Sequence, residues 1–447
     1  MSTTPAERPC AGQLGAGQLG AGQLGAGQLG AVRLGAVRLG AGRYLAAGSR
    51  PKSTITSVHE LTTADGATVR GVLATVPGAT TVVSLMHPRQ DLTHHPLVPL
   101  LLQAGAAVWT QHTRSASNDL TLVHEQAILD AAAGLVYLRE RGFGSIVTLG
   151  HSGGGALYAF YLEQAGLAPA ERIATTPGGR PAKLADAEMP PADGAIFLAP
   201  HPGQGQLLLA CIDPSVGDEQ DPMSVVPDLD PFSPANGFAE PPASSGYTEE
   251  FLGRYRTAQR DRVARIDAVA RGHLARTAEA RTAFGASGNA LDRRQSLAPR
   301  IITVFRTDAD PRTVDLSLDP SERPYGSLFG KRPDLINYGL TGFGRLTTPE
   351  AWLSTWSGLS SNADFVRCAP GVTVPTLFIE LTGDQAALPA DSRRMTGALG
   401  AEDLTTATVR GLHFGGPIAK GEPAGNELAA AEIIAWLAKR HELTPPA

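Results

Sequence analysis

Residues 150–154 read Gly-His-Ser-Gly-Gly, and they are the segment whose residue types most directly indicate chemistry. A serine hydroxyl is a weak nucleophile unless an adjacent base takes its proton and the backbone presents it clear of its surroundings. A tight turn from a strand into a helix presents it in this way and requires small neighbouring residues. We expect a strand at 145–149 and a helix at 156–164, so Ser152 is the candidate nucleophile.

Two further residues fit the partners that such a serine needs, a histidine base and a carboxylate that orients it. An expected strand at 376–381 is followed by Asp384, and an expected strand at 404–409 is followed by His413. Both side chains therefore begin loops at the ends of late strands. Asp391 is the alternative acid in the same region. If these residues are not catalytic, Asp384 would be a simple turn residue and His413 a buried structural histidine.

The elements expected around these residues alternate between short β-type runs and helical stretches, which predicts an α/β fold with a mostly parallel central sheet flanked by helices. An opening hairpin is expected around Asp65 and Gly66. The expected strands cover 54–63, 67–75, 80–86, 107–112, 145–149, 195–199, 376–381 and 404–409. The expected helices cover 96–104, 120–141, 156–164, 249–281, 391–399 and 427–441.

The organisation along the chain suggests four segments. Residues 1–50 contain the repeated pentapeptide Ala-Gly-Gln-Leu-Gly and its variants, whose frequent glycines and five-residue period build no apolar helix face, so we expect a disordered arm. Residues 51–200 and 372–447 are expected to form the two parts of one core. Between them, the alternation fails over 201–371, where a long insertion with its own helices predicts a helical cap.

The chain order of serine, aspartate and histidine on these strand ends resembles the α/β-hydrolase family, from about Thr54 to the C-terminus. The resemblance implies a triad of Ser152, Asp384 and His413, with the backbone N–H of Gly153 as one donor to the oxyanion. The family draws its second donor from a His-Gly turn after the third strand. Here that turn reads His-Pro-Arg, and proline has no N–H, so Arg89 becomes the expected second donor.

Several residues are candidates for binding substrate. The side chain of Arg89 could pair with a substrate carboxylate, or it could be a solvated loop arginine. Arg114 lies in a loop at the same end of the sheet, where Asn118 could instead cap the next helix. Trp352 and Trp356 in the expected cap could shape an apolar pocket.

Composition excludes other classes of function. The 447 residues include 38 basic and 43 acidic side chains, a net charge of -5 that argues against nucleic acid and anionic membranes as partners. The longest near-apolar run, 96–109, is too short to cross a bilayer. Three widely spaced cysteines favour a reducing, cytoplasmic location. Adjacent histidines at 94–95 lack metal-ligand partners at suitable spacing, and we expect neither metal nor cofactor.

These observations predict a serine hydrolase that cleaves a carboxylic ester through an acyl-enzyme. Arginines facing the pocket would favour an acid half-ester, such as a monoalkyl ester of an aromatic dicarboxylate. The same triad also serves amidases, lactonases, C–C bond hydrolases and acyltransferases. A non-catalytic ligand sensor on the same scaffold is the alternative from another class. The expected partner is a small-molecule ester, and the sequence leaves a homo-oligomer open.

Overall fold

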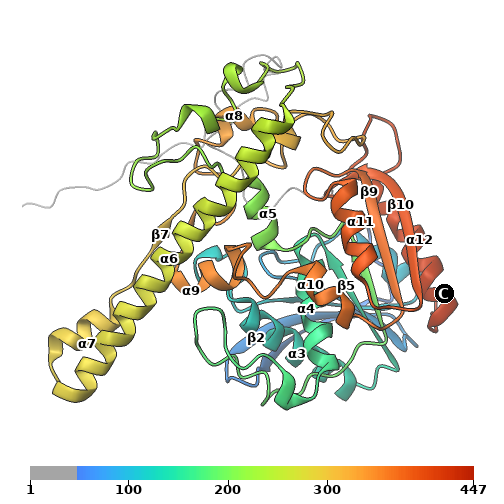
Figure 1. The fold of residues 1–447 in the computed structure, drawn as a ribbon. Coiled ribbons are helices and arrows are strands. Elements are labelled where there is room, and N and C mark those ends of the chain that lie inside the picture. Colours follow the sequence, from blue (N-terminus) through green and yellow to red (C-terminus); the bar gives the residue numbers. More distant parts are fainter. Residues whose placement is uncertain (1–47, 447) are drawn as a thin grey trace, which may run out of the picture. The chain divides into compact units, whose positions relative to one another are not determined.

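A computed structural model describes residues 48–446 of the chain, all within one compact unit. The pentapeptide repeats, and with them nearly all of the arm expected at 1–50, lie outside the described residues. Figure 1 shows a central sheet with helices on both faces and a helical segment beside one end of it. Over the described range, no helix combines the length and apolar character needed to cross a membrane.

Eight strands form the central sheet in the order β1-β2-β4-β3-β5-β6-β9-β10. The pairs β1–β2 and β2–β4 are antiparallel, whereas the other neighbours run parallel. The registers align Leu149 of β5 with Leu85 of β3 and with Ile196 of β6, so these strands end at one edge. The strands are β1 Ile55–Thr62, β2 Thr68–Thr75, β3 Thr81–His87, β4 Ala107–His112, β5 Ser145–His151, β6 Gly194–Leu198, β9 Thr376–Gly383 and β10 Leu404–Leu412.

Helices cover both faces of the sheet because its central strands are apolar on both sides. Every residue of β3 and β6 is buried. One core lies between the sheet and α3 and α4, and the other lies between the sheet and α2 and α12. These helices and the one after β9 are α2 Leu97–Gln103, α3 His124–Glu140, α4 Gly153–Gly166, α11 Pro389–Ala398 and α12 Gly425–Arg440.

The stretch between β6 and β9 contributes no strand to the large sheet. It has two apolar clusters of its own, and a small antiparallel pair, β7 Ile302–Thr303 and β8 Leu346–Thr347, joins its parts. We call this stretch the cap; its expected boundaries at 201 and 371 stay a prediction. Its helices are α5 Gln204–Cys211, α6 Glu249–Ser287, α7 Ala290–Leu297, α8 Pro333–Ile336, α9 Pro349–Ala351, the π-helix Trp352–Trp356 and α10 Phe365–Cys368.

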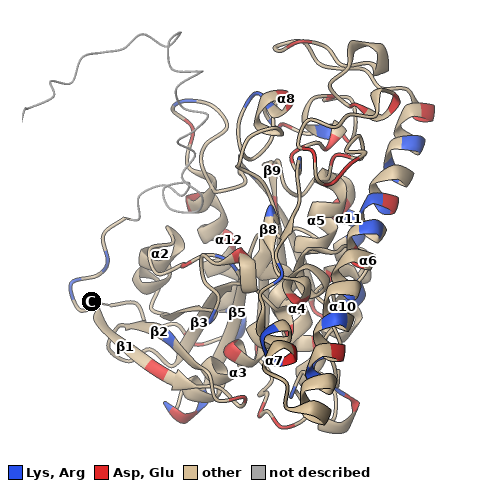
Figure 2. Cartoon of the chain, turned by 90° about the vertical axis from the view of Figure 1, so that its left-hand side faces the viewer, with Lys and Arg blue, Asp and Glu red and all other residues tan. Residues whose placement is uncertain are grey.

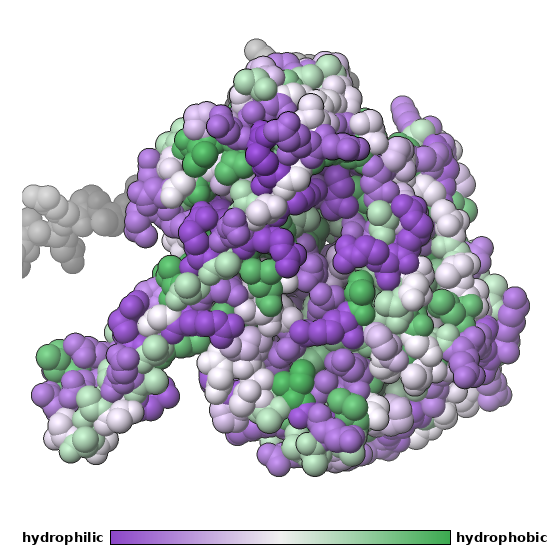
Figure 3. Space-filling model, in the orientation of Figure 1, coloured by the Kyte–Doolittle hydropathy of each residue, from purple (hydrophilic) through white to green (hydrophobic). Residues whose placement is uncertain are grey.

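The longest element of the cap is α6, whose 39 residues exceed the helix expected at 249–281. Thr248 caps its start by accepting the N–H of Phe251, and Gly288, with a left-handed backbone at φ 65°, follows its last residue. The ribbon of this helix in Figure 2 alternates between basic and acidic positions, a pattern typical of a solvated helix surface. Its far end with α7 extends beyond the core, and hydrophilic and hydrophobic residues mix there (Figure 3).

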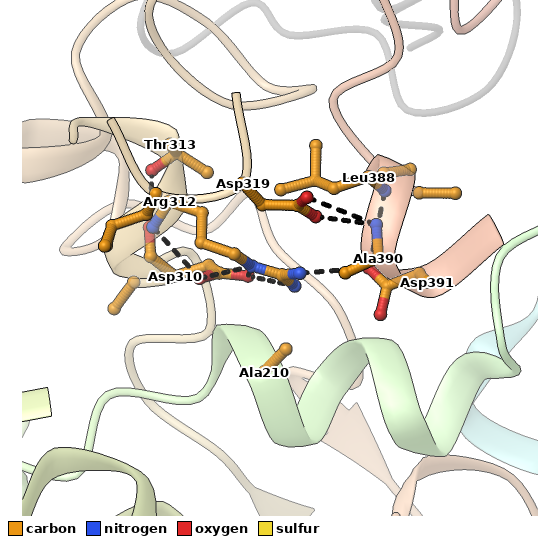
Figure 4. Close-up of polar contacts among 12 residues, drawn as sticks. Ala210, Asp310, Arg312, Thr313, Asp319, Leu388, Ala390 and Asp391 are labelled. Carbon is orange, nitrogen blue, oxygen red and sulfur yellow. Dashed lines mark hydrogen bonds and ion pairs between the residues drawn. The ribbon is translucent and has the colours of Figure 1, made fainter. Parts of the chain in front are cut away.

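Charged contacts join the cap to the core next to α11 (Figure 4). Arg312 of the cap donates to Asp310 beside it and, at 3.0 Å, to Asp391 on the first turn of α11. The carboxylate of Asp319 accepts the N–H of Ala390 at 2.9 Å.

The helix expected from 120 begins only at His124, because Asn118 caps a separate short turn by accepting the N–H of Leu120.

Candidate active site

Ser152 occupies the turn between β5 and α4, and its backbone is strained. Its φ of 57° and ψ of -122° lie in a region that residues with side chains rarely adopt. The neighbouring glycines allow this turn because β5, α4 and β3 approach closely. A Cβ atom on Gly150 would lie 2.4 Å from the carbonyl oxygen of Gly154, and one on Gly154 would lie 2.4 Å from that of Met86. The serine is therefore presented at the carboxyl end of the sheet.

The structure brings Ser152, His413 and Asp384 together from the ends of β5, β10 and β9. The Oγ atom of Ser152 lies 2.9 Å from His413 Nε2, and His413 Nδ1 lies 2.8 and 2.9 Å from the two oxygens of Asp384. A carboxylate only accepts, so Nδ1 carries the proton and Nε2 presents its lone pair to the serine hydroxyl. All three residues are buried, with exposures of 7%, 2% and 2% in chain order for Ser152, Asp384 and His413. This geometry suits proton transfer from the serine to the histidine.

The carboxylate of Asp384 is fixed by its own loop. Its Oδ1 atom accepts the backbone N–H of Ala386 at 2.6 Å and that of Ala387 at 3.1 Å. The alternative acid, Asp391, is occupied by Arg312 and by the N–H of Leu388. The structure therefore places Asp384, and not Asp391, beside the histidine.

The predicted oxyanion donors are only partly supported. Gly153 is the first residue of α4, so its N–H has no acceptor within the helix and is available beside Ser152. The backbone N–H of Arg89, expected as the second donor, instead points to His87 Nδ1 at 3.0 Å. The imidazole of His87 also accepts the N–H of Gln90, so the turn folds onto this ring. The prediction for Arg89 is therefore wrong for its backbone.

The side chain of Arg89 is neither solvated nor available to a substrate carboxylate. Its guanidinium makes two hydrogen bonds to Asp119 and lies 5.0 Å from the ring centre of Trp356 and 5.5 Å from that of Phe343. It is 17% exposed. Arg89 thus connects the loop after β3 to aromatic residues of the cap, which corrects both of the roles considered for its side chain.

Arg114 is a structural residue, contrary to the expectation that it binds substrate. Its guanidinium bridges Asp65 in the β1–β2 turn and Asp130 on α3, with ion-pair distances of 2.6 Å to each. Both carboxylates and the guanidinium are largely buried. The triplet holds the opening hairpin against α3, and no donor of the guanidinium is directed at Ser152.

This triplet makes stability depend on pH. The hydrogen bond from Arg114 lowers the pKa of Asp65 to about 2. A lowered folded-state pKa stabilises the fold above the unfolded-state value near 4, and this contribution is lost as the pH falls from about 4 to about 2. We expect Asp65→Asn to lower the free energy of unfolding by about 1–2 kcal/mol at pH 7 and by much less at pH 2 in urea titrations. An equal loss at both pH values would contradict this account.

The two tryptophans lie inside the cap and do not line an open pocket. Trp352 and Trp356 are both 0% exposed and belong to the apolar cluster under α6. The indole N–H of Trp352 donates to Asp267 of α6 at 2.7 Å. Their expected role in binding substrate is therefore corrected to packing. A pocket does lie between the core and the cap, next to the loop that begins at Asp384. Its lining includes Gln385, Ala386 and Leu207.

Buried histidines around the triad were missed by sequence reasoning. His95 Nε2 lies 3.0 Å from His151 Nδ1, and His151 Nε2 lies 2.9 Å from the carbonyl oxygen of His413. That carbonyl can only accept, so both rings carry their proton on Nε2. Burial lowers the pKa of His95 well below its ordinary value and that of His151 to about 3, which keeps both rings neutral.

Two more histidines, His87 and His201, follow the strands β3 and β6 and are also buried. Burial, aided by Arg89, lowers the pKa of His87 well below its ordinary value. Burial, with smaller contributions from His413 and Arg89, lowers the pKa of His201 to about 3. Each is followed by proline at a strand end, and this repeated His-Pro pair is the signal that the sequence offered. Within residues 48–446, no group of three or more side chains is arranged to hold a metal ion.

No protein-family model matches the chain, and no curated protein matches it in sequence. Among solved structures, similarity extends to DcsB in complex with a substrate analogue (12% identity, TM-score 0.46, 86% of this chain and 99% of that one). It also extends to a bacterial brefeldin A esterase (13%, 0.42, 89% and 80%) and to the Pyrococcus furiosus esterase Pf2001 (11%, 0.39, 89% and 96%). These similarities are too remote to assign an activity.

The chain's own geometry identifies its fold. The central sheet is mostly parallel, and a strained serine lies between a strand and a helix. An aspartate and a histidine reach that serine from later strands, in the chain order serine, aspartate, histidine. The chain therefore has the fold of the α/β-hydrolase superfamily.

Proposed function

We propose that this protein is a serine hydrolase that cleaves a carboxylic ester through an acyl-enzyme. The observation that carries the proposal is the hydrogen-bonded series from Ser152 through His413 to Asp384, at distances of 2.8–2.9 Å. Buried catalytic groups of this kind are protected from competing water, and a fixed histidine tautomer prepares the base.

In the first half of the reaction, Ser152 Oγ forms a bond to the ester carbonyl carbon and its proton moves to His413 Nε2. The π electron pair of the carbonyl moves onto its oxygen. When that pair returns, the bond to the alcohol oxygen breaks, and His413 gives its proton to the leaving alkoxide. Water then repeats the sequence on the acyl-enzyme, with His413 as base, and releases the acid and the free serine. Asp384 holds the imidazole throughout.

The contacts around the site favour a neutral ester. The arginines that suggested an acid half-ester are both occupied, Arg89 by Asp119 and Arg114 by Asp65 and Asp130. Burial also lowers the pKa values of His87, His95, His151 and His201, so these rings add no positive charge beside the serine at ordinary pH. The substrate of this proposal is therefore an uncharged ester of small or medium size.

Burst kinetics with p-nitrophenyl esters test the proposal. Wild-type protein should release about one equivalent of p-nitrophenol rapidly, and intact-mass measurement should show the acyl group on the protein. Ser152→Ala should lose the burst and reduce kcat by at least about 10⁴-fold, because only binding and oxyanion contacts remain. Ser287→Ala, at the exposed end of α6, is the matched control and should behave as wild type. Folded wild-type protein with no burst and no turnover would refute the esterase function.

A further inference from the structure

The unassigned second oxyanion donor leads to an inference that rests on the proposed function. The oxygen that becomes negatively charged during acylation needs preorganised donors, and Gly153 supplies one backbone N–H. The backbone N–H of Arg89 is bound to the ring of His87. Another group must therefore complete the stabilisation of the oxyanion.

Side-chain nitrogens converge beside Gly153. A Cβ atom at this position would lie 2.1 Å from Gln204 Nε2, 2.9 Å from His87 Nε2 and 3.1 Å from His201 Nε2. The three side chains come from the ends of β3 and β6 and from the first residue of α5, and each is at least 96% buried. A side chain at 153 would clash with these nitrogens, so only glycine lets all three approach the backbone here. They therefore lie next to the nucleophile, because the preceding residue is Ser152.

Both imidazoles direct an Nε2–H group toward Gly153. His201 Nδ1 accepts the backbone N–H of Gly203 at 3.1 Å, so its ring proton is on Nε2. His87 Nδ1 accepts two backbone N–H groups, and its proton is therefore also on Nε2. Because burial keeps both rings neutral, they can donate a hydrogen bond without competing with His413 for the serine proton.

His201 is also held rigidly against the nucleophile. Its backbone N–H donates to the carbonyl oxygen of Ser152 at 3.4 Å. Two residues later, Gly203 caps the start of α5. A preorganised donor needs no rearrangement when charge develops, which is the condition under which such donors are most effective.

We propose that the side chains of His201 and His87 donate their Nε2–H groups to the oxyanion and complete a hole whose backbone donor is Gly153. As Ser152 Oγ bonds to the carbonyl carbon, the π pair moves onto the carbonyl oxygen and is met by these N–H groups. Neither imidazole gives up its proton. When the pair returns and the alcohol leaves, the hydrogen bonds weaken again.

His201→Leu is the decisive variant, because the ring of His87 also holds the turn after β3 and its loss would disturb the backbone. We expect the acylation rate constant from the p-nitrophenyl butyrate burst to fall about 100-fold, while KM changes less than about threefold. The Ki of an aryl trifluoromethyl ketone, which forms a hemiketal oxyanion with Ser152, should rise by about the same factor. His201→Gln, whose amide N–H can reach the position of Nε2, should recover most of both losses. His273→Leu on α6 should match wild type.

The outcomes separate the two proposals. A normal wild-type burst with unchanged acylation and unchanged ketone inhibition in His201→Leu overturns the histidine hole and leaves the esterase function standing. Absence of any burst in folded wild-type protein overturns both. If His201→Leu does not fold, ¹⁵N-histidine-labelled wild type decides: the Nε2–H resonance of His201 should move downfield when the ketone adduct forms, and an unmoved resonance overturns the proposal.

Discussion

Asp384→Asn is expected to lower kcat by about 10⁴-fold while leaving the fold intact. Oδ1 of Asp384 accepts the N–H groups of Ala386 and Ala387, and an asparagine oxygen can take the same place. Its NH₂ group would then face His413 Nδ1, which must become the acceptor. The ring proton would move to Nε2, where it blocks transfer from Ser152. Steady-state rates with p-nitrophenyl esters and thermal melting measure the two effects.

Asp391→Asn is the matched control for this experiment. Asp391 was the rival acid in the sequence, and its carboxylate pairs with Arg312 of the cap. We expect the free energy of unfolding to fall by about 1 kcal/mol, since Arg312 keeps Asp310, and kcat to stay within about threefold of wild type. A large loss of kcat in Asp391→Asn with little loss in Asp384→Asn would reverse the assignment of the acid.

Gly154→Ala is expected to destabilise the protein by about 3 kcal/mol or more, or to prevent folding. A single methyl group there would lie 2.4 Å from the carbonyl oxygen of Met86, so α4 would have to move away from β3. Because α4 begins beside Ser152, any variant that folds should also lose activity. Urea titration followed by circular dichroism measures the stability of the soluble fraction.

Gly166→Ala controls for the intrinsic effect of alanine in the same helix. Gly166 is the last residue of α4 and is exposed, and a Cβ atom there meets nothing within 4 Å. Alanine should therefore leave stability unchanged or raise it by up to about 1 kcal/mol. If both variants lost stability equally, helix propensity and not the contact with β3 would be responsible.

The central part of the fold was predictable because local patterns sufficed. All eight strands of the sheet and the helices of the core appear within a few residues of their expected positions, since buried parallel strands are short apolar runs between turns. The start of α3 was misplaced because Asn118, a local cap, takes the preceding turn. In the cap, only α6 was expected, because short helices such as α8 depend on contacts that sequence periodicity does not contain.

The residues at the site divide in the same way. The positions of Ser152, Asp384 and His413 could be predicted from the sequence, because each follows a strand at a fixed place in chain order. The ion-pair partners of Arg89 and Arg114 could not be predicted, since Asp119 and Asp65 come near these arginines only when the loops fold against one another. An arginine near a sheet end has the same appearance in sequence whether it is paired or free. The roles of His87 and His201 depend on ring tautomers, which only their backbone partners define.

The position of the cap between β6 and β9 has a consequence for synthesis on the ribosome. At roughly 5–20 residues per second, translation from Leu198 to Thr376 takes about 10–35 s. During that interval β6, all of whose residues are buried in the finished protein, has no neighbour on the side that β9 will occupy. An unpaired apolar edge invites pairing with other chains. The nascent protein is therefore expected to depend on chaperones until its last two strands emerge, and it cannot be enzymatically active before His413 has left the ribosome.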